Sequence, residues 1–397
     1  MGLSEEFDLA GAARRVAFNR LAVAAAAALA VALARPRARA EDALAYKFEQ
    51  YSEEDGRISV ATQSSAVDED IGASTHLRLT GTTDAVAGAT PTGRPAPDGS
   101  SNVVLTEIHT RRKAWSADVA EQLRNVNIDL GFAESRESDY VSYGWSLNTL
   151  TDFNEKNTTV RAGIAGTDDR VEVFFEPAYL PKHTTSGILG VTQVLTPLAF
   201  VTVNLSGGEE DGYLAEPHKT VEKSIEIFEN IFLSEAFGEN RPAGRQVHSV
   251  LGSFNQAVPA ARAALETSYR FYWDSYGVRS GTAEVAWLQH LGRSLLVTPS
   301  VRFYEQGAAS FYYYNLDATS ITPSRVPTEA APYYSSDFRL SSFVSTSVGL
   351  KATWAPRSWV QVDVGYERYA MRGRDGVTPG SAYPTAGIST VGIKYLW

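Results

Sequence analysis

Long segments in which apolar and polar side chains alternate are the feature that most constrains the fold of this sequence. In residues 360–367 the even-numbered positions are Val, Val, Val and Tyr, and the odd-numbered positions are Gln, Asp, Gly and Glu. Successive side chains of a β-strand point to opposite faces, so this pattern predicts a strand with one apolar and one polar face. The same alternation recurs at 126–132, 141–148, 265–273 and 295–304.

Strand length helps to separate the architectures that use such strands. Soluble β-sandwiches also contain two-faced strands, so alternation alone does not exclude them. Many of these segments reach the roughly ten residues that a tilted strand needs to cross a bilayer, and their apolar faces often end in Trp or Tyr. We predict sixteen strands, or fourteen without the first two, at 44–53, 57–66, 74–84, 104–119, 124–134, 138–151, 157–168, 186–195, 198–208, 245–256, 262–273, 279–290, 294–305, 337–353, 358–370 and 386–397.

The connections between these strands separate into a short set and a long set. If the N-terminus lies in the periplasm, every predicted periplasmic turn is short, and all long connections fall on the other side. Short periplasmic turns and longer extracellular loops are typical of outer-membrane barrels. The sequence therefore predicts an all-β, transmembrane antiparallel up-and-down β-barrel in the bacterial outer membrane. Its long loops are expected at 85–103, 169–185, 209–244, 306–336 and 371–385.

The loop at 209–244 also shows helical spacing. This pattern predicts a short amphipathic helix within an insertion at about residues 217–238, which would pack against the protein's own loops. A lid or a partner-binding helix is the alternative. The apolar face would carry Val221, Ile225, Phe228 and Phe232, and the acidic face Glu222, Glu226 and Glu229.

Residues 1–40 have the organisation of a targeting segment. Arg14, Arg15 and Arg20 precede an apolar run at 21–34, and a small-residue cleavage site follows at 38–40. We predict a signal peptide at 1–40 and a barrel at 41–397. The Arg14-Arg15 pair also fits twin-arginine export, but a barrel must cross the inner membrane unfolded, which favours ordinary secretion.

Composition excludes several kinds of chemistry. The chain contains no Cys, so disulfides, thiolate metal sites and a cysteine nucleophile are excluded. Residues 1–40 hold six Arg and three acidic residues, so their removal leaves 30 basic and 43 acidic residues and a net charge of about −13. This balance argues against a nucleic-acid partner.

The C-terminal segment 391–397 has apolar or aromatic residues at alternate positions and ends in an aromatic residue. It resembles the terminal signal of bacterial outer-membrane barrels, which the barrel-insertion machinery reads. Tyr395 and Trp397 would carry this signal here. Phe is the usual last residue in such signals, so Trp397 departs from the pattern.

A wider resemblance covers nearly the whole mature chain. Its blocks are residues 137–140, 187–196, 239–242, 269–274, 333–340 and 365–369, including Glu-Asn-Arg-Pro and Tyr-Tyr-Ser-Ser-Asp-Phe-Arg-Leu. They resemble an uncharacterised family of bacterial outer-membrane barrels, recorded as a domain of unknown function. The resemblance implies the barrel and its location. Members of the family are often encoded near thioredoxin-like proteins and a flavin-transferase lipoprotein, which suggests a periplasmic redox or envelope partner.

The polar faces of the predicted strands collect charges of both signs. These groups either line a watery channel and bias which solutes pass, or pair with one another and only satisfy the interior. The two roles are compatible. The candidate lumen-lining residues are Asp129, Arg161, Glu266, Arg270, Glu284, Arg302, Arg339, Lys351, Asp363 and Glu367, with Lys394 on the same predicted face.

Other constellations give weaker signals. No two of the six His residues have a metal-ligand spacing, and His248 and Ser249 would point to opposite faces of a strand, so no catalytic couple is expected. Acidic clusters at 53–55 and 68–70 fit no EF-hand loop and are expected to be solvated. Tyrosine runs at 312–314 and 333–334 favour loop self-packing or interface anchoring over sugar stacking.

These observations favour an outer-membrane barrel that acts as a pore or as a scaffold for an envelope complex. We expect no enzymatic activity, cofactor or metal site, and partners limited to outer-membrane lipid, the insertion machinery and an envelope protein. The main alternative is a barrel partner of a periplasmic thioredoxin-like or flavin-dependent redox system, which co-purification would test. A barrel lipase or protease is less favoured, and a secreted soluble β-protein, whose apolar faces would have to meet one another instead of lipid, is the last alternative.

Overall fold

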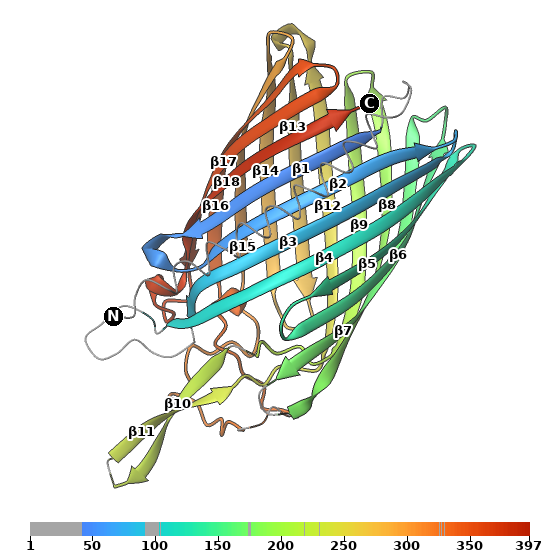
Figure 1. The fold of residues 1–397 in the computed structure, drawn as a ribbon. Coiled ribbons are helices and arrows are strands. Elements are labelled where there is room, and N and C mark those ends of the chain that lie inside the picture. Colours follow the sequence, from blue (N-terminus) through green and yellow to red (C-terminus); the bar gives the residue numbers. More distant parts are fainter. Residues whose placement is uncertain are drawn as a thin grey trace, which may run out of the picture.

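The structure of the chain is a closed antiparallel barrel of sixteen strands. Figure 1 shows the long, tilted strands of its wall. This computed structural model describes residues 42–91, 103, 105–173, 176–217, 219–229, 231–324, 326, 328 and 330–397. The predicted fold class and the count of sixteen strands are confirmed. Neighbouring barrel strands pair antiparallel, and β1 closes the barrel against β18. The predicted signal peptide at 1–40 lies outside the described residues.

The barrel strands are long and follow one another around the wall in chain order. The first eight are β1 (Ala43–Glu53), β2 (Ser59–Ile71), β3 (Thr75–Pro91), β4 (Leu105–Leu123), β5 (Val126–Arg136), β6 (Tyr140–Phe153), β7 (Thr158–Val173) and β8 (Glu176–Thr196). The other eight are β9 (Ala199–Gly212), β12 (Gly244–Val258), β13 (Ala263–Asp274), β14 (Arg279–Leu291), β15 (Leu295–Gln306), β16 (Phe343–Arg357), β17 (Val360–Gly373) and β18 (Thr385–Leu396).

The two ends of the barrel differ as the connection lengths predicted. Short turns join β2 to β3, β4 to β5 and β6 to β7 at the end where Ala43 pairs with Leu396, so this end is periplasmic. The long loop predicted at 169–185 is wrong, because β7 and β8 continue to Val173 and from Glu176. At this end of β7 the apolar residues Val171 and Val173 are buried and Arg170 and Glu172 are exposed. Beyond the apolar belt the ladder needs no apolar outer face, so the pattern that identified the other strands is missing here.

The outer face of the wall is an apolar belt. Phe132 on β5 lies opposite Trp145 on β6, and these side chains are 60% and 40% exposed. In water such a continuous apolar surface would drive aggregation, whereas a bilayer covers it with lipid chains. At the periplasmic rim, Tyr395 stacks on Trp397 with ring centroids 5.9 Å apart. The role of these two aromatic residues in insertion stays a prediction.

The predicted amphipathic helix in the 217–238 insertion is wrong. The loop instead forms a separate antiparallel hairpin of β10 (Thr220–Phe228) and β11 (Ile231–Gly238), which projects from the extracellular end in Figure 1. Val221 lies opposite Phe237, and Ile225 opposite Leu233. The spacing of Val221 and Ile225 fits a helix face but equally fits one face of a strand, and pairing with β11 satisfies the backbone groups of β10.

Helical structure in the described residues is limited to single turns. These are the 3₁₀ turns η1 (Glu54–Gly56), η2 (Pro259–Ala261), η3 (Phe338–Leu340) and η4 (Gly380–Ala382). No helix in the described part of the chain has the length and apolar character needed to span a membrane.

Candidate functional site: the lumen wall and the extracellular cap

The inner face of the barrel carries nine of the ten candidate residues. The pairing register places each of them on the face opposite the exposed apolar belt; for example, Glu284 lies across from Arg302 while the neighbouring Val285 and Val301 are outward. The nine residues are Asp129, Arg161, Glu266, Arg270, Glu284, Arg302, Lys351, Asp363 and Glu367. Lys394 shares this face.

Two parts of the wall, β16–β17 and β5–β7, hold charged side chains with protein partners. Lys351 on β16 approaches Asp363 on β17 with Nζ and Oδ1 3.2 Å apart. Asp129 accepts a hydrogen bond of 3.4 Å from the amide of Asn148, whose oxygen accepts one of 3.2 Å from Arg161. These contacts join three strands, β5, β6 and β7, through polar side chains and satisfy part of the interior.

Further inward pairs lie on β2, β3 and β4 and were not among the candidates. Arg78 lies 3.2 Å from Asp68, and Arg112 contacts Asp84 at 2.5 Å. The alternation of apolar and polar residues in β3 and β4 is enough to predict that Arg78 and Arg112 point into the lumen. Only the strand register reveals that their partners stand opposite them.

Other charged side chains of the inner face have no protein partner among the described residues. Glu266 and Arg270 on β13, Glu284 on β14 and Arg302 on β15 are exposed on the inner face. Glu367 and Lys394 complete this set on β17 and β18. Among the described residues none of the six side chains makes an ion pair or a side-chain hydrogen bond, so the structure brings them to one surface without coupling them. We call them the unpaired lumen charges.

Long loops meet at the extracellular end and form a cap, defined here as the described parts of 213–243, 275–278, 307–342 and 374–384. The backbones of Asn240 and Tyr334 exchange hydrogen bonds of 2.8 and 3.0 Å. Ser336 donates to the carbonyl of Thr220 at 2.6 Å, and the Tyr312 hydroxyl lies 2.5 Å from that of Thr378. These bonds tie three loops together.

Apolar clusters support the cap from within. Val221, Phe237, Leu316 and Tyr334 form one buried cluster, in which Tyr334 is 1% exposed. Burial of Val221 and Leu316 contributes about 1.5–3 kcal/mol each. This packing agrees with the expectation that the tyrosine runs serve loop self-packing.

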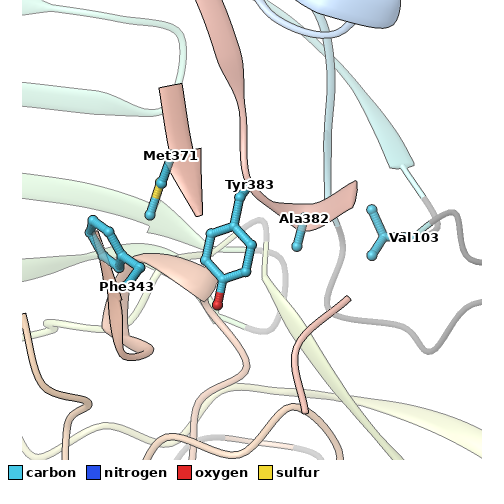
Figure 2. Close-up of a cluster of buried hydrophobic side chains, with 5 residues drawn as sticks. All are labelled: Val103, Phe343, Met371, Ala382 and Tyr383. Atoms are coloured by element: carbon cyan, nitrogen blue, oxygen red, sulfur yellow. The ribbon is translucent and has the colours of Figure 1, made fainter. Parts of the chain in front are cut away.

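A second cluster fastens the cap to the strand ends. Figure 2 shows Tyr383 between Phe343 and Ala382, with Met371 and Val103 beside them. The Tyr383 hydroxyl lies 2.8 Å from that of Ser341. A Cβ on Gly373 would lie 2.2 Å from the Tyr383 ring, so only glycine allows this close contact.

Arg339, the tenth candidate, lies in the cap and not on a barrel strand. The strand predicted at 337–353 begins only at Phe343, and residues 338–340 form the turn η3. The Asp337 carboxylate caps this turn by accepting a hydrogen bond of 3.1 Å from the backbone N–H of Arg339. Residues 338–340 are therefore not extended, and β16 starts after the turn. The placement of Arg339 on an inward strand position is therefore wrong.

A network of ion pairs in the cap surrounds Asp337. Its carboxylate lies 2.6 Å from Arg339 and 3.0 Å from Arg241. Arg241 also lies 2.7 Å from Glu239, and Arg339 lies 3.1 Å from Glu216. The side chains of Glu239 and Asp337 are 0% and 2% exposed, so these charges interact in a poorly solvated interior.

The pKa values of the two buried carboxylates, Glu239 and Asp337, are shifted in opposite directions. Burial raises the pKa of Glu239, with Arg241 opposing and Asp337 adding to the shift. Burial alone would also raise the pKa of Asp337, but Arg339 and Arg241 outweigh it and hold that pKa below its ordinary value. The site therefore favours a proton on Glu239 over one on Asp337.

A vestibule lies between the cap and the inner strand ends. This cavity of about 760 Å³ is lined on the barrel side by Tyr140, Lys182 and Glu210, and on the cap side by Arg241 and Arg339. The cap thus does not fill the mouth, and the vestibule is a polar space of the size of a small solute.

The structure keeps His248 and Ser249 apart, as their positions on one strand predicted. His248 faces outward and stacks on Trp273 at 5.3 Å, whereas Ser249 faces inward and its hydroxyl lies 2.8 Å from that of Ser206. The two side chains thus point to opposite faces. Within the described ranges no group of three or more His, Asp or Glu residues has the geometry to hold a metal ion.

A closed sixteen-stranded barrel with an apolar outer belt and a polar inner face defines an outer-membrane β-barrel, and the protein resides in the bacterial outer membrane. A family model described as "Protein of unknown function (DUF3570)" matches residues 18–179 and 177–385, and the chain belongs to this family. No curated protein matches the sequence.

Solved barrels resemble the chain only distantly. The siderophore receptor PirA from Pseudomonas aeruginosa is 10% identical with a TM-score of 0.44, over 91% of this chain and 62% of that one. A bacterial polysaccharide outer membrane secretin is 10% identical with a TM-score of 0.49, over 91% and 100% of the two chains. CdiB from Acinetobacter baumannii is 8% identical with a TM-score of 0.49, over 91% and 61%. The chain thus spans less than two thirds of PirA and CdiB.

Proposed function

We propose that this barrel is a passive channel for small hydrophilic solutes, restricted at its extracellular mouth by the cap. The observation that carries the proposal is the set of unpaired lumen charges. A charged group without a partner in a dry interior costs several kcal/mol, so groups such as Arg270 and Glu284 require hydration. A barrel of sixteen strands is wide enough to hold an aqueous channel.

The balance of these charges gives the channel its expected selectivity. Glu266, Glu284 and Glu367 oppose Arg270, Arg302 and Lys394, so the unpaired set is neutral overall. A lumen of this kind passes small ions of either sign with little preference. The vestibule would then limit passage by size and not by charge.

Conductance in planar bilayers tests the proposal. The purified mature chain should produce discrete conductance steps, and a variant with a loosened cap, Asp337→Ala, should produce larger or longer openings. Heat-modifiable gel mobility provides the control that both proteins are folded barrels. If neither folded protein conducts, the channel proposal is rejected and a scaffold role is favoured.

A further inference from the structure

A hollow lies on the outer, membrane-facing side of β4 and β5. This cavity of about 800 Å³ is lined by His109, Arg111, Lys113, Trp115, Glu134 and Arg136, among other residues. The register places Trp115 opposite Glu134 and Lys113 opposite Arg136. All four therefore stand on the face that also carries the exposed Phe132, outside the lumen.

On the β3 side, small side chains stand opposite the long side chains of β4 that line the hollow. Arg111 lies opposite Ala85, Lys113 opposite Thr83 and Trp115 opposite Gly81. A Cβ built on Gly81 would meet nothing within 4 Å. The longer side chains of β4 therefore border a free surface where a ligand can lie against the wall.

The lining of the hollow has a net positive charge, because Arg111, Lys113 and Arg136 outnumber Glu134 and Glu137. Glu134 accepts a hydrogen bond of 2.9 Å from the Trp115 indole N–H and contacts Arg136, which offsets its charge. Arg111 and Lys113 are exposed and make no ion pair or side-chain hydrogen bond among the residues that the structure describes. With three cations and two carboxylates, the lining carries a net charge of +1, although the whole chain has a net charge of −10.

The height of the hollow in the membrane identifies the region it faces. Trp115 follows Lys113 by two positions on the same face, and Val119 continues this face toward the periplasmic turn. Tryptophan concentrates where a barrel passes from hydrocarbon to headgroups. Arg111 and Lys113 lie on the extracellular side of Trp115, at the level of the outer-leaflet headgroups.

We propose that this hollow binds a phosphorylated glycolipid of the outer leaflet. Arg111 and Lys113 would bind the phosphate, since guanidinium and ammonium groups form strong charge-assisted hydrogen bonds with it. The acyl chains would lie along Trp115 and the apolar belt below. A cationic rim directly above an apolar surface fits an amphiphile with an anionic head better than a free anion. This proposal is independent of the channel function.

Native mass spectrometry of the detergent-solubilised full chain tests the site with three probes: bisphosphorylated lipid A, its dephosphorylated counterpart and inorganic phosphate. The wild type should retain bisphosphorylated lipid A, and the double variant Arg111→Glu/Lys113→Glu should bind it roughly tenfold or more weakly. The matched control is Arg170→Glu/Arg279→Glu, which reverses two exposed cations at outward positions of β7 and β14. The control should bind like the wild type.

Three outcomes would overturn the proposal. These are equal binding by the double variant and the wild type, equal binding of the dephosphorylated probe, and full displacement of lipid A by inorganic phosphate, which would indicate a free-anion site. A dimer that dissociates only in the double variant would instead assign the hollow to contact with a second copy. Heat-modifiable mobility confirms that every protein compared is folded.

Discussion

Charged side chains gather in two regions of this barrel, the cap and the lumen wall, but their surroundings differ. In the cap, Asp337 is almost fully buried and contacts two arginines. On the wall, Glu266 and Arg270 are exposed and have no charged partner within the described part of the chain. The same residue types therefore tie loops together where they are buried in the cap, and stay exposed on the inner wall, so burial separates the two uses of charge.

Removal of Asp337 should destabilise the cap most. The Asp337→Ala variant leaves Arg241 and Arg339 without their shared carboxylate, and breaking such a buried pair costs about 3–5 kcal/mol. Limited proteolysis should then cleave loop 307–342 far faster than in the wild type, while heat-modifiable mobility of the barrel is retained. Unchanged protection of the loop would contradict the structural role of the network.

Protonation of Glu239 should make cap stability depend on pH. Its pKa is raised, so its contribution to stability is fully present below the unfolded pKa and is lost as pH rises through the raised folded pKa. Hydrogen exchange of residues 237–241 should therefore accelerate across that window. The Glu239→Gln variant should show a flat profile there.

Asp337 should make cap stability depend on pH in the opposite direction from Glu239. Because the pKa of Asp337 is lowered, its carboxylate stabilises the cap fully at pH values above the unfolded pKa. This stabilisation is lost as pH falls through the folded pKa. The wild type and Glu239→Gln should therefore both lose cap protection in strong acid. If hydrogen exchange of residues 237–241 depends on pH equally in both proteins at higher pH, Glu239 is excluded as the titrating group.

Reversal of two unpaired lumen charges should change ion selectivity and leave stability nearly unchanged. The variant Glu266→Lys/Glu284→Lys adds positive charge to hydrated positions, so reversal potentials in a salt gradient should shift toward anions by a several-fold change in permeability ratio. The thermal unfolding midpoint should match that of the wild type. A large loss of stability would mean that these carboxylates are paired in the folded protein.

The smallest effect is expected at an exposed pair beside the cap. Arg374 and Glu305 lie 3.5 Å apart, and their side chains are 58% and 55% exposed. The Arg374→Ala variant should cost at most about 1 kcal/mol, since solvent screens such a pair. Proteolysis of loop 307–342 in this variant is the control for Asp337→Ala. A comparable loss of protection in both would remove the contrast between buried and exposed pairs.

The sequence alone determined the barrel, its strand number and the face of most wall residues. Alternation is a local property of each strand, so residues 360–367 reveal their two faces without knowledge of any partner. The same rule separated His248 from Ser249. Connection lengths identified the periplasmic end because outer-membrane barrels have short periplasmic turns and longer extracellular loops.

Tertiary structure decided which charges pair and how the long loops fold. Val221 and Ile225 fit both a helix and a strand, and pairing with β11 resolved the choice. Arg339 meets Glu216, which is 123 residues away in the chain. Contacts between such distant segments depend on the register and closure of the whole barrel, which no local periodicity encodes.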